Sequence, residues 1–172
     1  MEKESQQDIF MEALRQYEVA LYRICYIYSD RSPENVADLY QDIVYTLWDS
    51  YDQYKSKSSL TTWIYRVALN VARRHRYTRS REPIFVSLNP ALCDTFAVEQ
   101  PDEQVLRLYE LVEKLSPDEK KVATLYLEDL SVKEMAVALN CSERTVERRI
   151  SEMKKKLREM HEREEKEVPL LR

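Results

Sequence analysis

The sequence of 172 residues contains no glycine. Phosphate-binding loops such as the P-loop and the dinucleotide-binding turn need glycine so that the backbone can approach the phosphates closely. This absence excludes the nucleotide-driven enzymes that use such loops. Helix C-termini also favour glycine, in the left-handed conformation, and here the corresponding positions carry Asp129 and Asn140. Aspartate and asparagine tolerate that conformation best among the other residues, so we expect the turns to form at a small cost.

Residues that ligate metals or act as nucleophiles are scarce. The two histidines, His75 and His161, are far apart, and the three cysteines form no CxxC motif. We therefore expect no metal site, no cofactor and free thiols in a reducing cytoplasm. Without clustered carboxylates or a base beside a nucleophile, a helical enzyme lacks a candidate catalytic group.

Long apolar runs are also missing. No stretch of about 18 apolar residues and no basic-then-apolar leader occurs, so neither membrane insertion nor secretion is expected, and a cytoplasmic location is the default. The formal net charge of −4 differs from the basic excess of most nucleic-acid-binding domains. The distribution of charge along the chain is therefore more informative than its sum.

The stretch 131–157 has the pattern of a helix-turn-helix. Ser131 with Glu134 forms a capping box at the start of a short apolar helix that ends at Asn140. Ser142 can cap a second helix, in which apolar residues recur at the spacing of one buried stripe. That stripe consists of Val146, Ile150, Met153 and Leu157.

The outer face of this second helix is basic. Arg144, Arg148, Ser151 and Lys155 lie opposite Val146, and Thr145 and Arg149 lie on one flank. In helix-turn-helix proteins the second helix enters the major groove of DNA. A solvated charged helix is the alternative interpretation, but two capped helices joined by a short turn favour DNA binding.

A helix beginning at Ser32-Pro33 carries an acidic stripe. Its apolar positions Val36, Tyr40, Ile43 and Leu47 predict the buried side. The opposite face carries Asp38, Gln41, Asp42 and Tyr45. Judged from these residues alone, the stripe is best interpreted as solvated surface.

The next helix, from about Thr61, combines an apolar face with a basic one. Arg66, Asn70, Arg73 and Tyr77 share one face, and the basic run extends through Arg74, His75 and Arg76 without an acidic residue until Glu82. Arginines bind phosphate while aromatic and amide side chains stack on or hydrogen-bond exposed bases, so this pattern suits a nucleic-acid strand. A basic helix end that complements its own dipole is the alternative, but it does not explain a stripe that starts at Arg66.

The sequence therefore predicts an all-α protein with two small helical domains joined by a linker, the second domain containing the helix-turn-helix. We expect the domains at 1–81 and 102–172, with the proline-containing segment 82–101 as the linker. Helical spacing marks core residues in both halves of the chain. In residues 1–30 they include Ile9, Phe10, Leu14, Leu21 and Ile24, and after Asp102 they include Val105, Leu108, Leu111, Val122, Leu125 and Tyr126. The charged tail after Leu157 is expected to fray.

Three segments together resemble a bacterial RNA polymerase sigma factor of the extracytoplasmic-function (ECF) type. ADLYQDIVYTLW (37–48) is similar to the polymerase-binding helix of that family, and TTWIYRVALNVARRHR (61–76) to its promoter-melting helix. The stretch from Leu115 to Arg158 is similar to the domain that reads the upstream promoter element. The resemblance spans nearly the whole chain, with both halves in the family's order.

The resemblance implies a non-enzymatic factor that directs core RNA polymerase to specific promoters and assists promoter melting. It reverses the interpretation of the acidic stripe, because in the family this face binds the clamp helices of the polymerase's largest subunit. An anti-sigma partner is also possible. The implied polymerase contacts are Asp38, Gln41, Asp42, Tyr45 and Trp48. The implied contacts to melted non-template DNA at minus 10 are Trp63, Arg66, Asn70, Arg73, Arg74, Arg76 and Tyr77. The implied contacts to duplex DNA at minus 35 are Ser142, Glu143, Arg144, Thr145, Arg148, Arg149 and Lys155.

A conventional helix-turn-helix regulator is the competing interpretation. The segment SERTVERR (142–149) also resembles the output domain of response-regulator-type activators, and the first domain would then be an effector or dimerisation module. That alternative leaves the arginine stripe from Arg66 unexplained.

Overall fold

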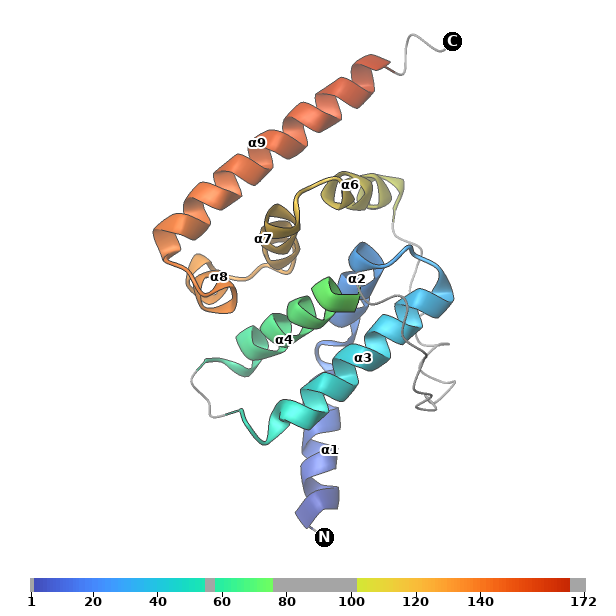
Figure 1. Cartoon of the computed structure of the whole chain (residues 1–172), viewed down its shortest axis with the longest axis vertical. Coiled ribbons are helices and arrows are strands. Elements are labelled where there is room, and N and C mark those ends of the chain that lie inside the picture. Colours follow the sequence, from blue (N-terminus) through green and yellow to red (C-terminus); the bar gives the residue numbers. More distant parts are fainter. Residues whose placement is uncertain (1, 55–57, 76–101, 168–172) are drawn as a thin grey trace. The chain divides into compact units, whose positions relative to one another are not determined.

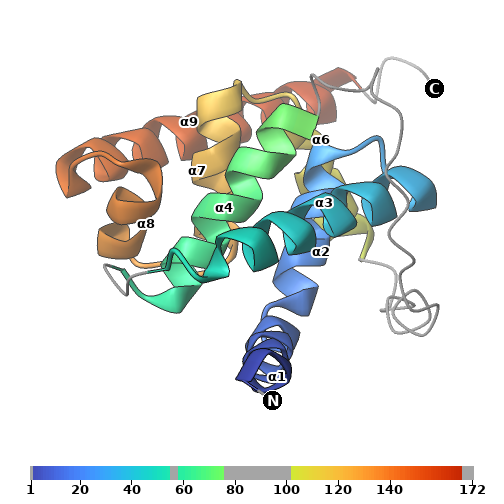
Figure 2. The same cartoon turned by 60° about the horizontal axis from the view of Figure 1, so that its bottom comes forward.

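The computed structural model describes residues 2–54, 58–75 and 102–167, and every regular element in these ranges is an α-helix (Figures 1 and 2). The chain divides into two compact units, Met1–Phe96 and Ala97–Arg172. The predicted all-α class with two helical domains is confirmed. The predicted linker, 82–101, lies outside the described residues.

The first unit contains four helices in its described part. The sequence suggested one helical stretch through residues 1–30, but the structure breaks it at Gln16 and Tyr17. At this break the hydroxyl of Tyr17 lies 2.7 Å from Thr61 Oγ1, and its ring meets Tyr65 edge-on. The helices are α1 (Glu2–Arg15), α2 (Glu18–Tyr28), α3 (Pro33–Tyr51) and α4 (Leu60–His75).

Helices α2, α3 and α4 pack against one another around an apolar core, with α3 and α4 side by side (Figures 1 and 2). Helix α1 adds Phe10 and Leu14 to the buried residues. Ile9 was predicted to be in the core, but its side chain is 60% exposed because Phe10 takes the inward position. Fully buried residues of the core include Leu21, Ile24, Leu39, Ile43, Leu47 and Ala68.

Helix α3 begins where the sequence predicted. Ser32 is the N-cap, and its Oγ accepts a hydrogen bond from the backbone N–H of Asn35 at 3.3 Å. Pro33 occupies the first helical position. Proline is favoured there because its missing N–H would have no helical partner. The stripe of Val36, Tyr40 and Ile43 is buried as expected, which turns the acidic stripe outward.

The second unit contains α6 (Glu103–Glu113), α7 (Pro117–Leu127), α8 (Val132–Leu139) and α9 (Glu143–Glu167). The predicted capping box of Ser131 with Glu134 is present, and Ser116 with Glu119 forms another at the start of α7. Helix α9 contacts the other three helices and supplies Val146 and Met153 to their common core. The remaining core residues include Val112, Leu115, Val122, Leu125 and Met135.

The helix ends without glycine adopt the predicted left-handed conformation. Asp129 has φ 55° after α7, and Asn140 has φ 52° after α8. A left-handed Asn140 lets the amide of Cys141 donate to the carbonyl of Ala136 at 3.0 Å, which satisfies a carbonyl at the helix end. Arg31 also has a positive φ, 65°, and its guanidinium lies over the Tyr26 ring.

Three expectations for the second unit were wrong. Val105 and Tyr126 are exposed rather than buried, and the Tyr126 ring is covered by the Lys154 ammonium, 4.2 Å from its centroid. The charged tail does not fray after Leu157, because α9 remains helical to Glu167. Glu164 falls on the same side of α9 as Val146, and its carboxylate binds Arg107 of α6 and Lys114, the residue that follows α6.

Candidate nucleic-acid and partner interfaces

In the helix-turn-helix of α8 and α9, side-chain hydrogen bonds cap the start of each helix. Ser142 Oγ accepts from the amide of Thr145 at 3.2 Å and contacts the Thr145 hydroxyl, so both hydroxyls help to cap α9. At the start of α8, hydrogen bonds from the side chain and backbone of Ser131 lower the pKa of Glu134. Local side-chain chemistry therefore fixes the positions of both helices of the motif.

The predicted DNA-reading face of α9 is solvent-exposed. Arg144, Arg148 and Lys155 are exposed, and Thr145 and Arg149 are half-buried on the flank, as expected. One feature was not foreseen: Arg148 Nη1 donates to both carboxylate oxygens of Glu152, at 2.8 and 3.0 Å. The guanidinium that the sequence assigned to bases already has an acidic partner one turn along the helix.

The basic face of α4 is likewise exposed. Arg66, Asn70, Arg73 and Arg74 point away from the core residues of the same helix. Arg74 Nε donates to the Asn70 carbonyl at 3.3 Å, which ties this side chain to its own helix. Arg76 and Tyr77 lie outside the described residues.

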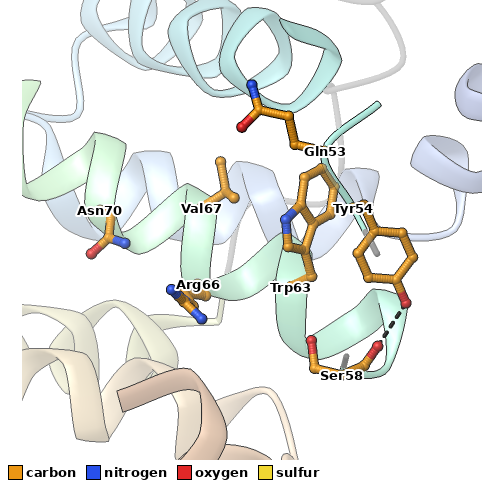
Figure 3. Close-up of a pocket in the computed structure, with 7 residues that line it drawn as sticks. All are labelled: Gln53, Tyr54, Ser58, Trp63, Arg66, Val67 and Asn70. Carbon is orange, nitrogen blue, oxygen red and sulfur yellow. Dashed lines mark hydrogen bonds between the residues drawn. The ribbon is translucent and has the colours of Figure 1, made fainter. Parts of the chain in front are cut away.

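A pocket of about 580 Å³ opens beside the first three turns of α4 (Figure 3). It brings together Trp63, Arg66 and Asn70 from the predicted strand site, but not Arg73 or Arg74. Val67 also contributes from α4. The other lining residues, Gln53, Tyr54 and Ser58, come from the connection between α3 and α4.

The predictions from sequence did not include these three residues, because the short segment between the two predicted helices is mostly polar and has no apolar periodicity. The Tyr54 hydroxyl donates to the Ser58 carbonyl at 2.7 Å, and this bond spans the connection (Figure 3). The Tyr54 and Trp63 rings lie 5.2 Å apart. An aromatic residue shortly before a helix that carries an arginine and tryptophan face was the available signal.

The acidic stripe of α3 has the exposure expected of a partner surface. Asp38 and Asp42 are exposed, Tyr45 is 63% exposed, and Gln41 is half-buried. Trp48 is 39% exposed, and its inner part packs against Phe10 with ring centroids 5.2 Å apart. A tryptophan and a tyrosine beside two carboxylates is an arrangement suited to a basic protein partner.

Asp42 also has a partner within the chain. Its Oδ2 lies 3.0 Å from Nδ1 of His75, the last residue of α4. No described residue forms a hydrogen bond or ion pair with Asp38, one helical turn away. The two aspartates that the sequence treated as equivalent therefore differ in their surroundings.

The part of the chain that the structure describes contains no group of His, Cys, Asp and Glu residues that could hold a metal ion. In the same residues, none of the helices has the length and apolar character needed to cross a membrane. Burial strongly raises the pKa of the Cys25 thiol, which opposes formation of a reactive thiolate.

Two family models match the chain, one in each unit. Residues 7–82 match the description "Sigma-70 region 2", and residues 106–157 match "Sigma-70, region 4". The first range contains α3, α4 and the pocket. The second contains the helix-turn-helix and ends within α9.

Curated relatives and solved structures agree with these matches. The chain is 24% identical over 131 residues to the RNA polymerase sigma-H factor of Pseudomonas aeruginosa, which covers 68% of each protein. It is 25% identical over 130 residues to the ECF RNA polymerase sigma-E factor of Escherichia coli, covering 67% of this chain and 68% of that protein.

The fold is similar to that of CnrH, solved in complex with the cytosolic domain of CnrY, with a TM-score of 0.67, 21% identity, and coverage of 91% of this chain and 89% of that one. It is also similar to that of the sigma factor RpoE of Bartonella quintana, solved with the anti-sigma factor NepR, with a TM-score of 0.64, 19% identity, and coverage of 89% and 96%. With both sigma-70 regions present in order, on the helices and exposed faces described above, the chain belongs to the ECF-type sigma factors, which direct RNA polymerase to promoters.

Proposed function

We propose that this sigma factor divides initiation between its two units. Residues 1–81 bind core polymerase through α3 and capture the melted non-template strand at minus 10 through α4. Residues 102–172 bind duplex DNA at minus 35 through α9, and residues 82–101 link the two. One observation carries most of this proposal: the pocket that joins Trp63, Arg66 and Asn70 to Tyr54.

The pocket has the chemistry needed to hold an unstacked base. Its volume of about 580 Å³ falls in the range of pockets that enclose small molecules. Tyr54 and Trp63 offer aromatic faces for stacking, Asn70 offers an amide for hydrogen bonds to a base edge, and Arg66 offers a cation for phosphate. Extruding a base costs a few kcal/mol, which such contacts offset, so the pocket favours the open promoter.

Duplex DNA at minus 35 is assigned to the exposed N-terminal half of α9. Ser142, Glu143, Arg144, Thr145 and Arg148 lie at the end of the helix that enters the major groove in this motif. Arg148 exchanges Glu152 for a base edge or phosphate on binding. An exposed pair four residues apart on a helix contributes only about 0.3 to 0.5 kcal/mol, so this exchange costs little.

The polymerase surface is assigned to Asp38, Gln41, Asp42, Tyr45 and Trp48 on α3. The proposed partner is the pair of clamp helices of the largest polymerase subunit, and the two carboxylates of this surface suit basic groups on that partner. Because CnrH and RpoE were each solved with a partner, CnrY and the anti-sigma factor NepR, we extend the proposal to an anti-sigma protein for this chain. Membership of a family of initiation factors implies a non-enzymatic role, which we assign to the cytoplasm, where the polymerase acts.

Run-off transcription tests the proposal directly. Core polymerase, with and without the purified chain, is supplied with genomic DNA fragments, and discrete transcripts are expected only when the chain is present. The free chain should bind duplex promoter DNA weakly and with strong salt dependence, because acidic surface outweighs its basic patches. Tight sequence-specific binding without polymerase, with no transcripts, supports the conventional regulator instead.

A further inference from the structure

We infer that Asp42 is a shared ligand that couples polymerase docking to strand capture, and that His75 is the positioning residue on the strand side. The inference rests on the proposed function, because it uses α3 as the polymerase surface and α4 as the strand surface. The two helices pack side by side (Figure 2), and the Asp42–His75 contact joins residues 33 positions apart in sequence.

The two side chains of this pair differ in exposure. The His75 side chain is 20% exposed, whereas the Asp42 side chain is 60% exposed. The imidazole is thus largely covered by the protein, while the carboxylate can accept a second partner from outside. Oδ2 of Asp42 is engaged with His75, and no described residue forms a hydrogen bond with Oδ1. A basic group of the polymerase can bind Oδ1 without displacing His75.

The position of His75 gives this contact a consequence for DNA. His75 ends α4 in a basic last turn with Arg73 and Arg74. The last four backbone carbonyls of a helix have no intrahelical donor, and helix ends fray most easily. The bond to Asp42 is therefore an anchor for the end of the helix whose earlier turns line the pocket, and Arg73 lies between the anchor and the pocket.

Docking of polymerase on α3 strengthens this anchor. An interface that covers Asp42 excludes water from the carboxylate, and a hydrogen bond to a charged group is stronger in a medium of lower dielectric constant. The C-terminal turn of α4 is then held more firmly in the conformation that binds the strand. Coupling between binding sites is reciprocal, so a bound strand must also increase the affinity of the chain for polymerase by the same factor.

The experiment measures that factor. The affinity of the full chain for core polymerase is determined with and without a saturating single-stranded oligonucleotide that carries the minus 10 non-template sequence. For the wild-type chain the oligonucleotide should tighten binding by about fivefold or more, within the usual range of coupling between sites. For His75→Ala this ratio should fall to nearly one, and for His75→Gln, which keeps an N–H donor, most of the ratio should return.

Asp38→Asn is the matched control, because Asp38 lies on the same face of α3 and has no ion pair with a described residue. It should weaken binding to polymerase but leave the ratio unchanged, whereas Asp42→Asn should reduce both. Circular dichroism and thermal unfolding of each variant separate these effects from loss of fold.

The outcomes distinguish this inference from the proposed function. If the oligonucleotide binds the polymerase complex of the wild-type chain but leaves its polymerase affinity unchanged, the shared-ligand inference is overturned, whereas if the oligonucleotide does not bind that complex at all, strand capture by α4 is wrong. If the oligonucleotide increases the polymerase affinity of the wild-type chain and of His75→Ala by the same factor, the shared-ligand inference is overturned and the proposed function stands. A ratio that falls equally in Asp38→Asn also overturns it, because the coupling would then belong to the whole face.

Discussion

The two candidate DNA surfaces are built differently. The duplex-facing surface belongs to one helix, α9, whose exposed arginines follow from helical spacing alone. The strand-facing surface is a pocket, and its walls combine α4 with Gln53, Tyr54 and Ser58 from the preceding connection. A duplex presents base edges in a groove that admits a whole helix, whereas an extruded base must be enclosed on several sides.

This difference has an energetic consequence. A side chain on the exposed face of α9 contributes to binding without supporting the fold, so its loss weakens one contact. A side chain in the pocket also packs against its neighbours, as Trp63 does with Tyr51 and Tyr54. Because duplex binding and strand capture act at different stages of initiation, substitutions in the two regions should also fail at different stages.

The largest expected effect is a loss of stability caused by a substitution in the buried core of the second unit. Met153 is 1% exposed, and Met153→Ala should destabilise the second unit by about 2 to 5 kcal/mol. Recognition at minus 35 should be lost with it, while the pocket of the first unit stays intact because that unit has its own core. Denaturant unfolding followed in parallel with minus 10 oligonucleotide binding checks this, and Met153→Leu, which conserves volume, should retain most of the stability.

The next effect concerns the reading face itself. Arg148→Ala should weaken recruitment to the promoter by about 1 to 3 kcal/mol if the guanidinium makes a bidentate contact with guanine, and the fold should be unaffected. A template with a pre-melted minus 10 bubble should not rescue it. Arg163→Ala, an exposed arginine near the far end of the same helix, is the control. Rescue of Arg148→Ala by the bubble template contradicts the division of labour between the surfaces.

In the pocket, Trp63→Ala should remove a stacking surface worth about 1 to 3 kcal/mol per base, and Asn70→Ala should act in the same direction. Closed-complex formation should be nearly normal, whereas promoter opening should be slow. The bubble template should partly restore transcription because the cost of unstacking is already met. Trp63→Phe keeps an aromatic face and should be milder. If Asn70→Ala already fails to form the closed complex, the assignment of Asn70 to strand capture is wrong.

A smaller effect is expected from a substitution in the connection between α3 and α4, which forms one wall of the pocket. Tyr54→Phe keeps the ring but removes the hydrogen bond from the hydroxyl to the Ser58 carbonyl, a bond worth about 0.5 to 1.5 kcal/mol. Fluorescence of 2-aminopurine placed at the extruded base should show weaker capture, with duplex recognition unchanged. Equal loss of duplex recognition indicates a general effect on folding instead.

The smallest effect concerns acid stability of the second unit. Burial opposes ionisation of Glu119, but hydrogen bonds from Lys156 and Ser116 outweigh it and lower its pKa. A lowered folded-state pKa stabilises the unit above about pH 4.5, the ordinary value, and that contribution is lost as pH falls toward the lowered pKa. Glu119→Gln should cost less than about 1 kcal/mol at neutral pH and flatten the dependence of thermal stability on pH below 4.5.

Local chemistry explains why so much of α8 and α9 could be predicted from sequence. Ser131, Glu134 and Asn140 act within a few residues of their own positions, and each makes the expected capping contact. The outward direction of Arg144 and Arg148 follows from the buried stripe that begins at Val146. These features require no knowledge of distant parts of the chain.

Features that depend on tertiary structure could not be predicted in this way. Tyr54 joins the pocket because the chain reverses between α3 and α4, and Asp42 meets His75 because the helices pack side by side. Ile9 was placed in the core by periodicity, but the aromatic contacts of Phe10 with Trp48 and Tyr51 set the rotation of α1. The ion pairs of Glu164 could not be predicted, because the sequence does not show which basic residues lie near a charged residue on the inward side of a helix.

The ion pairs of Glu164 hold the C-terminal part of the long helix α9. From Glu143 to Glu164 the helix rises about 1.5 Å per residue, which places this anchor roughly 30 Å from the end assigned to DNA. A tilt of about 5° at the anchor would move the reading end by nearly 3 Å, comparable to the length of a hydrogen bond. The contacts with Lys114 and Arg107, together with the buried Val146 and Met153, therefore hold the direction of the helix that is assigned to DNA.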